Sequence, residues 1–385
     1  METLYRRPLP ADAVEFSSPP GRRLFAEALA AGGLDGYFPL AEQFHTQAEP
    51  SFCGLGSLVV ALNALAIDPG RLWKGPWRWF SEELLDCCVS LDEIRRRGLD
   101  LDELTCLARC NGAEVELHRA DRADLAAWRT SLGAAARGDG VVIAAYDRGA
   151  LEQTGAGHFS PIGGYHAARD LALVLDVARF KYPPHWIGAE RLWRAMQPTD
   201  PATGRARGWM LLRRRARGVA LGFTLTCEGT DLHGFAERLA GVARELAPAA
   251  GIGELARALA PLTSYLAVRS PGSEAHQAAL TRTRAAVRSL AVFPQVREAL
   301  ALGAAGGGAE TAEAGAETAE AVTILLLAIA SRLPPARSEQ IVALIAEAEH
   351  DEALAGELAN LRAQLAALSA ATAADQTAEP HEPAR

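Results

Sequence analysis

The sequence changes character near residue 217, and this change constrains the fold more than any single motif. Before it, segments with helical spacing alternate with strand-like apolar runs, and glycines and prolines separate them. Beyond Cys227 the chain is rich in Ala, Leu, Glu and Arg at helical spacing, as in residues 231–247 and 281–302. We therefore predict an α+β domain over residues 1–217, followed by a mostly helical domain over residues 218–302.

The remaining C-terminal residues divide into three predicted segments. Residues 303–321 contain a near-repeat of GAETAEA and almost no large apolar side chain, which predicts a flexible linker. Two helical stretches with apolar stripes follow over residues 322–371. The stripes suit a helical hairpin or a self-association surface, so a homo-oligomer through the C-terminal helices is one expectation. Residues 372–385 are predicted to be disordered.

Charge and hydropathy exclude several classes of protein. The 385 residues are 49% hydrophobic and carry a formal net charge of −8, whereas a general nucleic-acid binder needs a surplus of Lys and Arg. No apolar run approaches the roughly 20 residues that span a bilayer. The basic pair near the N-terminus is not followed by the apolar core of a secretory signal. We therefore expect a cytoplasmic protein with reduced thiols that binds neither nucleic acid nor membranes.

One cysteine stands at the start of a predicted helix. In QAEPSFCGLGSL, Cys53 follows a proline turn and precedes apolar residues at helical spacing. Free N–H groups and the dipole at a helix N-terminus lower the pKa of a thiol. The alternative is a packing role, because cysteine is among the most buried residue types. Gln47, six residues earlier, favours a nucleophile, since in papain-like cysteine hydrolases this separation lets the glutamine amide and the cysteine N–H converge on an oxyanion.

A predicted hairpin supplies the base for this cysteine. Two extended apolar runs, residues 158–165 and 171–177, flank a short turn. Pairing about that turn makes Asp176 the diagonal same-face neighbour of His158, and a bulge at a glycine pair in the first run would bring them closer. One interpretation is that this histidine-aspartate pair has only a structural role and stabilises the sheet. In the catalytic interpretation His158 deprotonates Cys53, Asp176 orients the imidazole, and the thiolate attacks an amide carbonyl.

Four longer segments carry a resemblance to a known family. They are TQAEPSFCGLGSLVVALNALAIDPGRLWKGPWRWF, ELLDCC, TGAGHFSPIGGY and LDVARFKYPPHW, within a similarity that runs nearly continuously over residues 4–213. They resemble phytochelatin synthase, the glutathione γ-glutamylcysteinyltransferase family. The resemblance implies a papain-like domain in which a helical part carries the cysteine and an antiparallel sheet carries the histidine and the aspartate. It implies Cys53, His158 and Asp176 as the triad and Gln47 as the oxyanion donor.

The resemblance also implies glutathione as the substrate. The cysteine would cleave the Cys-Gly bond and keep a γ-Glu-Cys acyl group, and transfer of that group to glutathione or its oligomers makes phytochelatins for heavy-metal detoxification. Asp200 and Arg207 fall where the family holds the γ-glutamyl group, a task that suits arginine; an exposed loop pair is the alternative. Three basic residues near the histidine and aspartate form an expected subsite for a second glutathione, or only solvated surface: Arg148, Arg179 and Lys181.

Four further cysteines are candidate ligands for metal ions. Cys106 and Cys110 stand four residues apart, on one face of a predicted helix, and thiolates select soft metals. The family shares these two and also Cys87 and Cys88, which implies a role in binding Cd, Zn or Cu ions; core packing is the alternative. The resemblance implies activation by these ions without an organic cofactor, partly because a metal-glutathione thiolate can itself be the acceptor.

Two other functions fit the same residues. A glutathione hydrolase would use the same acyl-enzyme and release γ-Glu-Cys to water, and a thiolate metal-binding protein would not use the triad at all. The C-terminal half departs from the longer family members, which are rich in cysteine there, since no cysteine follows Cys227. Phe52 stands where many relatives carry tyrosine, so a hydroxyl contact is lost at that position.

Overall fold

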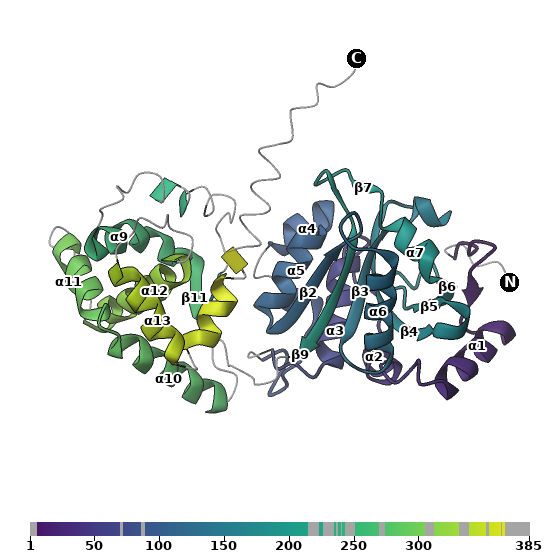
Figure 1. Cartoon of the computed structure of the whole chain (residues 1–385), viewed down its shortest axis with the longest axis horizontal. Coiled ribbons are helices and arrows are strands. Elements are labelled where there is room, and N and C mark those ends of the chain that lie inside the picture. The colour runs from purple at the N-terminus through teal and green to yellow at the C-terminus, as the bar shows by residue number, and fades with distance from the viewer. Residues whose placement is uncertain are drawn as a thin grey trace, which may run out of the picture.

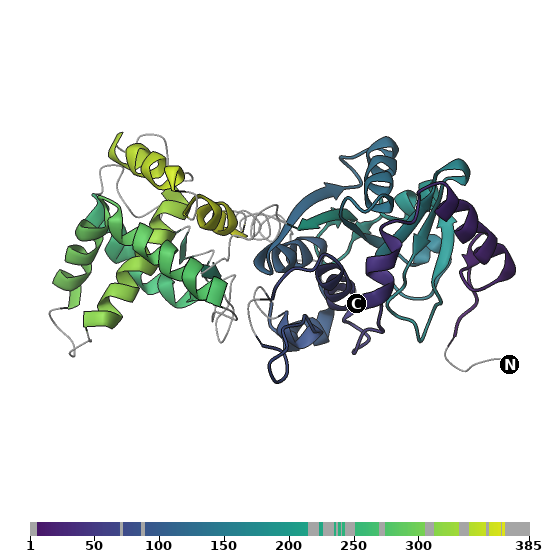
Figure 2. The same cartoon turned by 90° about the horizontal axis from the view of Figure 1, so that it is seen from below.

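The computed structural model describes the first half of the chain almost continuously and the second half in parts (Figure 1). The described residues are 6–69, 72–85, 89–214, 223–225, 235, 238–239, 241–242, 251–268, 274–304, 312–330, 339–351, 354–362 and 364–365. They form two lobes in both views, one built around a sheet and one built mainly of helices (Figure 1, Figure 2). The predicted α+β class with a mostly helical C-terminal region is therefore confirmed.

A seven-stranded antiparallel sheet forms the centre of the first lobe. Its strands pair in the order β1-β6-β5-β4-β3-β9-β2, so β4 is the central strand. The bounds are Val14–Glu15 for β1, Ala113–Arg119 for β2, Val141–Asp147 for β3, Gly157–His166 for β4, Leu171–Val174 for β5, His185–Gly188 for β6 and Gly208–Arg214 for β9. Two short strands, β7 (Thr199–Asp200) and β8 (Arg205–Ala206), pair with each other outside this sheet.

Strand β3 buries side chains on both faces of the sheet. Val141 and Ile143 belong to one apolar cluster, whereas Val142 and Ala144 belong to a second. This is the two-residue period of a strand that is covered on both sides. The first cluster continues into helices α1, α2, α3 and α5, and the second continues into α6 and α7.

Helices therefore cover both faces of the sheet (Figure 1). Their bounds are Pro19–Ala30 for α1, Tyr37–Gln43 for α2, Cys53–Ala64 for α3, Leu91–Arg97 for α4, Leu101–Cys110 for α5, Leu125–Ala136 for α6 and Ala189–Ala195 for α7. Three short 3₁₀ turns connect them with the strands, namely η1 (Glu82–Leu84), η2 (Gly149–Leu151) and η3 (Ala167–Arg169). The helix-sheet-helix layering fixes α3 against β4, which places the start of α3 beside the centre of the sheet.

The hairpin of β4 and β5 contains the predicted bulge but ends earlier than predicted. The pairing shifts register between Ile162 and Gly164, at the glycine pair where a bulge is expected. A Cβ on Gly163 would lie 2.9 Å from the Leu175 side chain, so only glycine fits there. Because β5 ends at Val174, Asp176 lies in the loop after the strand, and the predicted second strand, which ran to residue 177, is three residues too long.

The second lobe surrounds a two-stranded pair with helices. Its described elements are β10 (Phe223–Leu225), α9 (Ile252–Leu259), η4 (Ala260–Tyr265), β11 (Leu266–Val268), α10 (Glu274–Ser289), α11 (Phe293–Ala304), α12 (Ala312–Ala330) and α13 (Glu339–His350). α12 and α13 contact each other, in the region where a hairpin is predicted. Among the described residues, no helix combines the length and apolarity that crossing a bilayer requires.

Helix α12 takes in part of the segment predicted as a flexible linker. Residues 312–321 are helical, because Ala and Glu are strong helix formers and because two glutamates pair with α10. Glu317 lies 3.1 Å from Arg284, and Glu320 pairs with Arg284 and Arg288. The rest of the predicted linker, except its first two residues, and the predicted tail 372–385 lie outside the described residues. The domain boundaries at residues 217 and 302 stay predictions.

Candidate active site

Cys53 is the first residue of helix α3. Phe52 occupies the capping position, and its side chain accepts no hydrogen bond from the N-terminal N–H groups of the helix. These N–H groups and the helix dipole therefore act on the thiol. The first turn fits closely against its neighbours, because a Cβ on Gly56 would lie 3.0 Å from Glu82 Oε1 and 3.2 Å from Gln47 Cβ.

His158 on β4 and Asp176 in the loop after β5 lie beside this cysteine. His158 Nε2 is 2.9 Å from Asp176 Oδ1, so Nδ1 is the ring nitrogen left to act on the nearby Cys53 thiol. His158 is 5% exposed and Asp176 is fully buried, whereas Cys53 is only partly buried. The arrangement holds the imidazole in one orientation beside the partly buried cysteine.

The electrostatics of the three side chains favour a thiolate next to an imidazolium. Burial on its own raises the pKa of the Cys53 thiol, but the charge and hydrogen bond of His158 and a backbone bond from Phe159 bring this pKa below its ordinary value. Burial on its own lowers the pKa of His158. The charge of Asp176 outweighs this effect, so the pKa of His158 is raised above its ordinary value. Burial raises the pKa of Asp176, but the charges of His158 and Arg148 hold it far below its usual range.

These shifts predict how Cys53 reacts with an alkylating reagent. We expect iodoacetamide to modify the Cys53 peptide with a pH midpoint below the 8.5 or so of an ordinary thiol. In His158→Ala the midpoint should rise by about one pH unit or more, because the charge that stabilises the thiolate is lost. Mass mapping of the modified peptide measures both midpoints. An unchanged midpoint in the variant would show that His158 does not act on the thiol.

Arg148 supports the aspartate from the end of β3. Its Nη2 donates to both carboxylate oxygens of Asp176, at 3.0 and 2.8 Å, and its Nη1 donates to Gln153 Oε1 at 2.6 Å. The guanidinium also lies 4.9 Å from the centre of the Tyr182 ring, and the residue is 3% exposed. The predicted contact between Arg148 and a second glutathione would have to use the N–H groups that these bonds leave over.

Gln47 lies beside the first turn of α3, with its side-chain amide turned toward the backbone. Its Nε2 donates to the carbonyl oxygens of Glu49 and Pro50 at 2.7 and 2.9 Å. Its backbone N–H donates to Val177 at 3.0 Å, which ties this segment to the residue after Asp176. The predicted oxyanion role needs an N–H aimed at the substrate, so it requires the amide to turn when a substrate binds. That role stays a prediction.

Glu82 holds the same segment from the opposite side. Both of its carboxylate oxygens accept from the N–H of Ala48, at 3.2 and 3.0 Å, and the residue is 7% exposed. Burial raises the pKa of Glu82 to about 7, the Ala48 N–H opposes this shift, and the nearby charge of Glu49 adds to it. Within the described residues no cation pairs with this carboxylate, so its ionisation costs stability.

This buried carboxyl predicts a stability that depends on pH. Between pH 4.5, its ordinary pKa, and about pH 7 the folded protein keeps a proton that the unfolded chain has lost, so stability falls as pH rises through this window. Glu82→Gln should therefore be more stable than the native protein by about 2 kcal/mol at pH 8 and nearly equal to it at pH 4.5. Urea unfolding at both pH values measures this, with Glu83→Gln on the exposed side of the same turn as the control. Equal midpoints at pH 8 would contradict it.

Asp200 and Arg207 lie close to each other and to the histidine. Arg207 Nη2 is 3.9 Å from Asp200 Oδ1 and 3.7 Å from Asp147 Oδ2. The guanidinium occupies the space that a Cβ on Gly157 would need, at 3.3 Å, and Gly157 directly precedes His158. The pair therefore offers a cation and carboxylates next to the reacting groups, as a zwitterionic end group requires.

The two other predicted basic residues follow Asp176 in the chain and differ in their partners. Lys181 Nζ donates to the carbonyl oxygen of Thr154 at 2.5 Å. Arg179 is exposed, and its guanidinium lies 4.8 Å from the centre of the Phe44 ring. Within the described residues, no carboxylate forms an ion pair with Arg179.

The structure describes two of the four cysteines predicted as metal ligands. Cys87 and Cys88 lie outside them. Cys106 and Cys110 are buried in α5, within the apolar cluster that also contains α3. In the part of the chain that the structure describes, no group of three His, Cys, Asp or Glu side chains is placed to hold a metal ion. A protein metal site stays a prediction.

Comparison with known proteins identifies the family. The profile of phytochelatin synthase matches residues 4–209, which is more than half of the chain and includes all the candidate catalytic residues. The chain belongs to the phytochelatin synthase family. The match ends at the start of β9, so the helical lobe lies outside it.

Three relatives show how far the similarity to this family extends. Glutathione gamma-glutamylcysteinyltransferase 1 from Triticum aestivum is 55% identical over 227 residues, 58% of this chain and 45% of the relative. The protein of the same name from Lotus japonicus is 51% identical over 241 residues, 62% and 48% of the two chains. Glutathione gamma-glutamylcysteinyltransferase from Schizosaccharomyces pombe is 42% identical over 212 residues, 55% and 51%. This chain spans about half the length of the relatives it matches.

Sequence reasoning missed the residues that support the aspartate in this phytochelatin synthase family member. Gln153 accepts from Arg148 and lies 3.4 Å from His185 Nε2. Tyr182 lies beneath the Arg148 guanidinium and accepts from the Thr154 N–H at 2.8 Å. The available signal was the charged and aromatic run ARFKYPPHW, which begins two residues after Asp176 and is unusual for a surface loop that has no binding or support role.

Proposed function

We propose that this chain is a γ-glutamylcysteine transpeptidase that releases glycine from glutathione and transfers γ-Glu-Cys to glutathione or its oligomers. The observation that carries the proposal is the closeness of Cys53, the first residue of α3, to His158, which is hydrogen-bonded to the buried Asp176. Family membership and the names of the relatives support the same chemistry. We also propose that the sheet-containing lobe is papain-like, since a helix carries the cysteine and an antiparallel sheet carries the histidine.

In the first half-reaction the Cys53 thiolate attacks the carbonyl carbon of the Cys-Gly peptide bond. The C–N bond then breaks as His158 gives its proton to the nitrogen of the leaving glycine, and a γ-Glu-Cys thioester remains on the sulfur. Asp176 stabilises the imidazolium that exists before this transfer and keeps Nδ1 directed at the sulfur. Backbone N–H groups at the start of α3 stabilise the oxyanion.

In the second half-reaction the α-amine of an acceptor attacks the thioester. The amine passes its proton to His158, the C–S bond breaks, and the Cys53 thiolate is regenerated with a new amide in the product. Water in place of the amine gives γ-Glu-Cys, so acceptor binding and exclusion of water decide between transfer and hydrolysis.

The donor would be held by its γ-glutamyl end. Its α-carboxylate pairs with Arg207, and its α-ammonium lies against Asp200. This assignment rests on the closeness of the two side chains to each other and on the contact of Arg207 with Gly157. Arg207 is 4% exposed, so its pairing with a ligand takes place with little water and is correspondingly strong.

Metal ions enter this proposal as part of the substrate. Two glutathione thiolates bind one Cd, Zn or Cu ion, because soft metals select thiolate ligands, and such a complex presents the same amine and carboxylates as free glutathione. Activation by these ions in heavy-metal detoxification then needs no ligand from the protein. A cysteine site that includes Cys87 and Cys88 remains a separate proposal.

One incubation tests the function. The purified protein is given millimolar glutathione with and without Cd ions, and glycine, γ-Glu-Cys and (γ-Glu-Cys)n-Gly are followed by chromatography with mass detection. Oligomers that increase with Cd are the expected result. Glycine and γ-Glu-Cys without oligomers would make the protein a hydrolase with the same acyl-enzyme, and no glycine in either condition would refute an enzyme of this type.

A further inference from the structure

Asp102 brings two arginines together close to the residues proposed to hold the donor. It stands in the first turn of α5, and its Oδ2 lies 2.6 Å from Arg119 Nη2 and 2.6 Å from Arg205 Nη1. Asp102 and Arg119 are both buried. One carboxylate thus faces two cations in a place with little water, where charges interact strongly and cost desolvation to bury. The catalytic steps proposed above make no use of this cluster.

Both arginines reach the two-stranded ribbon of β7 and β8, which carries Asp200. Arg119 Nη1 donates to the carbonyl oxygen of Ala206, the last residue of β8, at 2.7 Å. Arg205 lies directly opposite Asp200 in the ribbon, and Arg207 follows the ribbon in the chain. The shared carboxylate is therefore one contact away from the neighbours of both groups that would bind the γ-glutamyl end.

The charges of Asp200 and Arg207 are held apart in this structure. Arg207 Nη2 is 3.9 Å from Asp200 Oδ1, which is longer than a hydrogen bond. The Nη1 of Arg207 donates to the carbonyl oxygens of Pro198 and Thr199 at 2.9 and 3.3 Å, and its own carbonyl accepts from the Ala120 N–H at 2.9 Å. A ligand with an ammonium and a carboxylate on one carbon needs this separation, because each of its charges must reach one of the two side chains.

The position of Asp102 protects this separation in two ways. Opposite charges that face each other across two strands attract, so Arg205 would by itself pair with Asp200, and Asp102 holds it instead. Through Arg119 the same carboxylate fixes the end of β8. A ribbon with two residues in each strand is too short to keep its own position, so contacts from outside the ribbon decide where it lies.

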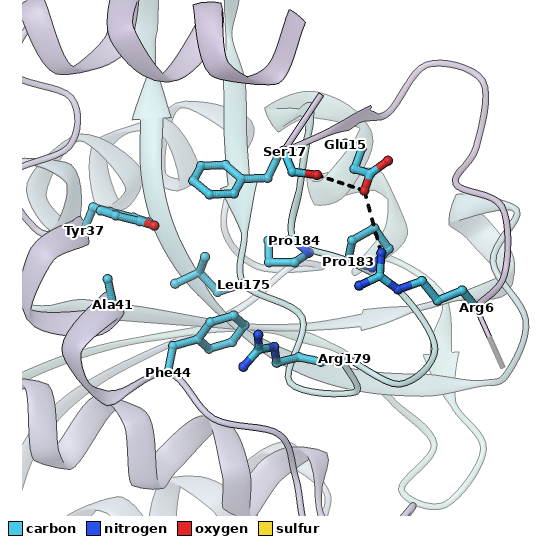
Figure 3. A pocket seen from close by; sticks show the side chains of 11 residues that line it. Arg6, Glu15, Ser17, Tyr37, Ala41, Phe44, Leu175, Arg179, Pro183 and Pro184 are labelled. Atoms are coloured by element: carbon cyan, nitrogen blue, oxygen red, sulfur yellow. Dashed lines mark hydrogen bonds and ion pairs between the residues drawn. The ribbon is translucent and has the colours of Figure 1, made fainter. Parts of the chain in front are cut away.

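A cavity of about 370 Å³ in the same lobe is separate from this arrangement (Figure 3). It lies between β1, helix α2 and the loop that follows Asp176, and its lining includes Arg6 and Arg179 but none of the candidate catalytic residues. The donor has to place its peptide bond at the catalytic residues. The arginine suited to its end group is therefore Arg207, which packs against the glycine directly before His158.

We propose that Asp102 is a positioning residue for the donor, which holds the β7–β8 ribbon so that Asp200 and Arg207 together fit the γ-glutamyl end of glutathione. This inference rests on the proposed transpeptidase function. Asp102 acts through Arg119 and Arg205 and touches neither the substrate nor the reacting atoms. Its loss should weaken the selection of a zwitterionic end group more than it weakens the chemistry of the thiol.

Two substrates measure this selection. One is glutathione, and the other is its analogue with hydrogen in place of the α-carboxylate of the γ-glutamyl group. With the protein in excess over the substrate and below saturation, glycine release reports the first half-reaction alone, so the acceptor does not enter. We expect the native protein to react with glutathione faster than with the analogue by about tenfold or more, as a lost charge-assisted bond predicts.

Substitutions in the cluster should lower this preference. We expect a loss of at least about fivefold in Asp102→Asn, because a small misplacement of a binding group is costly. The loss in Arg205→Gln should be about threefold, since one tether is lost and the competitor for Asp200 is removed with it. Asp102→Glu keeps the charge and should restore part of the preference. Arg213→Gln is the matched control, because Arg213 is 32% exposed against 30% for Arg205 and pairs with Glu116 at 3.3 Å, and it should keep the native preference.

The outcomes separate this inference from the function on which it rests. A purely structural Asp102 would lower both rates by the same factor, so an unchanged preference in Arg205→Gln and in every folded Asp102 variant would overturn the positioning role alone. If Asp102→Asn does not fold, the partly exposed Arg205 still carries the test. A native preference near one would overturn the donor assignment of Asp200 and Arg207 together with the positioning role, and absence of glycine would refute the enzyme itself.

Discussion

Asp176→Asn is expected to lower glycine release by about 10³- to 10⁴-fold, the scale seen when the carboxylate of a catalytic triad is replaced by its amide. Asp176 is fully buried and accepts from His158, from Arg148 and from the N–H of Ala178 at 2.9 Å. An amide cannot accept from all three and carries no charge. His158 then loses both its orientation and the charge that raises its pKa.

The same substitution should also destabilise the fold by about 3 kcal/mol or more, because Arg148 is left as a buried charge without its partner. Single-turnover glycine release and urea unfolding measure the two effects. The matched control is Asp170→Asn, since Asp170 pairs with Arg129 at 2.6 Å on a partly exposed surface, where an ion pair is worth about 1 kcal/mol at most. Equal losses in the two variants would show that Asp176 has only the role of a surface ion pair.

The cysteine helix and the hairpin were predictable because each depends on local sequence. Apolar spacing after Pro50 places the start of a helix at Cys53, and the structure begins α3 at that residue. The two apolar runs around a short turn bring His158 near Asp176, and the glycine pair marks the bulge. In these segments the apolar residues of the sequence recur with the same period as the side chains buried in the structure. The local sequence is therefore enough to predict them.

The supports of the site depend on how separate elements pack against one another, which no local pattern reveals. Arg148 follows the last residue of β3, and the pairing of Tyr146 with His158 carries it to the side of Asp176, 28 residues away. Glu82, in the turn η1, reaches Ala48 across 34 residues through tertiary packing of two loops. The sequence therefore indicates that a basic residue is near the site, while only the sheet order shows that it binds the aspartate.

The start of α12 could not be predicted for a different reason. A segment of Ala, Gly and Glu has little apolar surface, so its own composition favours a linker. Its helix depends on arginines of α10 that pair with Glu317 and Glu320. Local propensity and a tertiary partner together decide the structure there, and a single segment of sequence shows only the first of them.

Cys53→Ser is expected to abolish transfer and glycine release by about 10⁴-fold or more, while the protein still binds glutathione. A serine hydroxyl at this position keeps the size of the side chain, but a neighbouring imidazole does not ionise it as it does a thiol. The fold should be unchanged, because residues 54–62 of α3 supply the buried contacts and Cys53 is only partly buried.

Three measurements decide between a nucleophile and a packing or metal-binding cysteine. Glycine release gives the loss of chemistry, calorimetric titration with glutathione gives its binding, and the unfolding midpoint gives stability. Ser57→Ala, which removes one buried oxygen atom from the same helix, is the control and should retain glycine release. A Cys53→Ser protein that still turned over glutathione would return Cys53 to a packing role. One that lost only metal capacity would make the protein a thiolate metal binder. Loss of turnover with retained binding assigns the acyl-enzyme to this sulfur, since no other group in the hydrogen-bonded series of His158 and Asp176 can carry it.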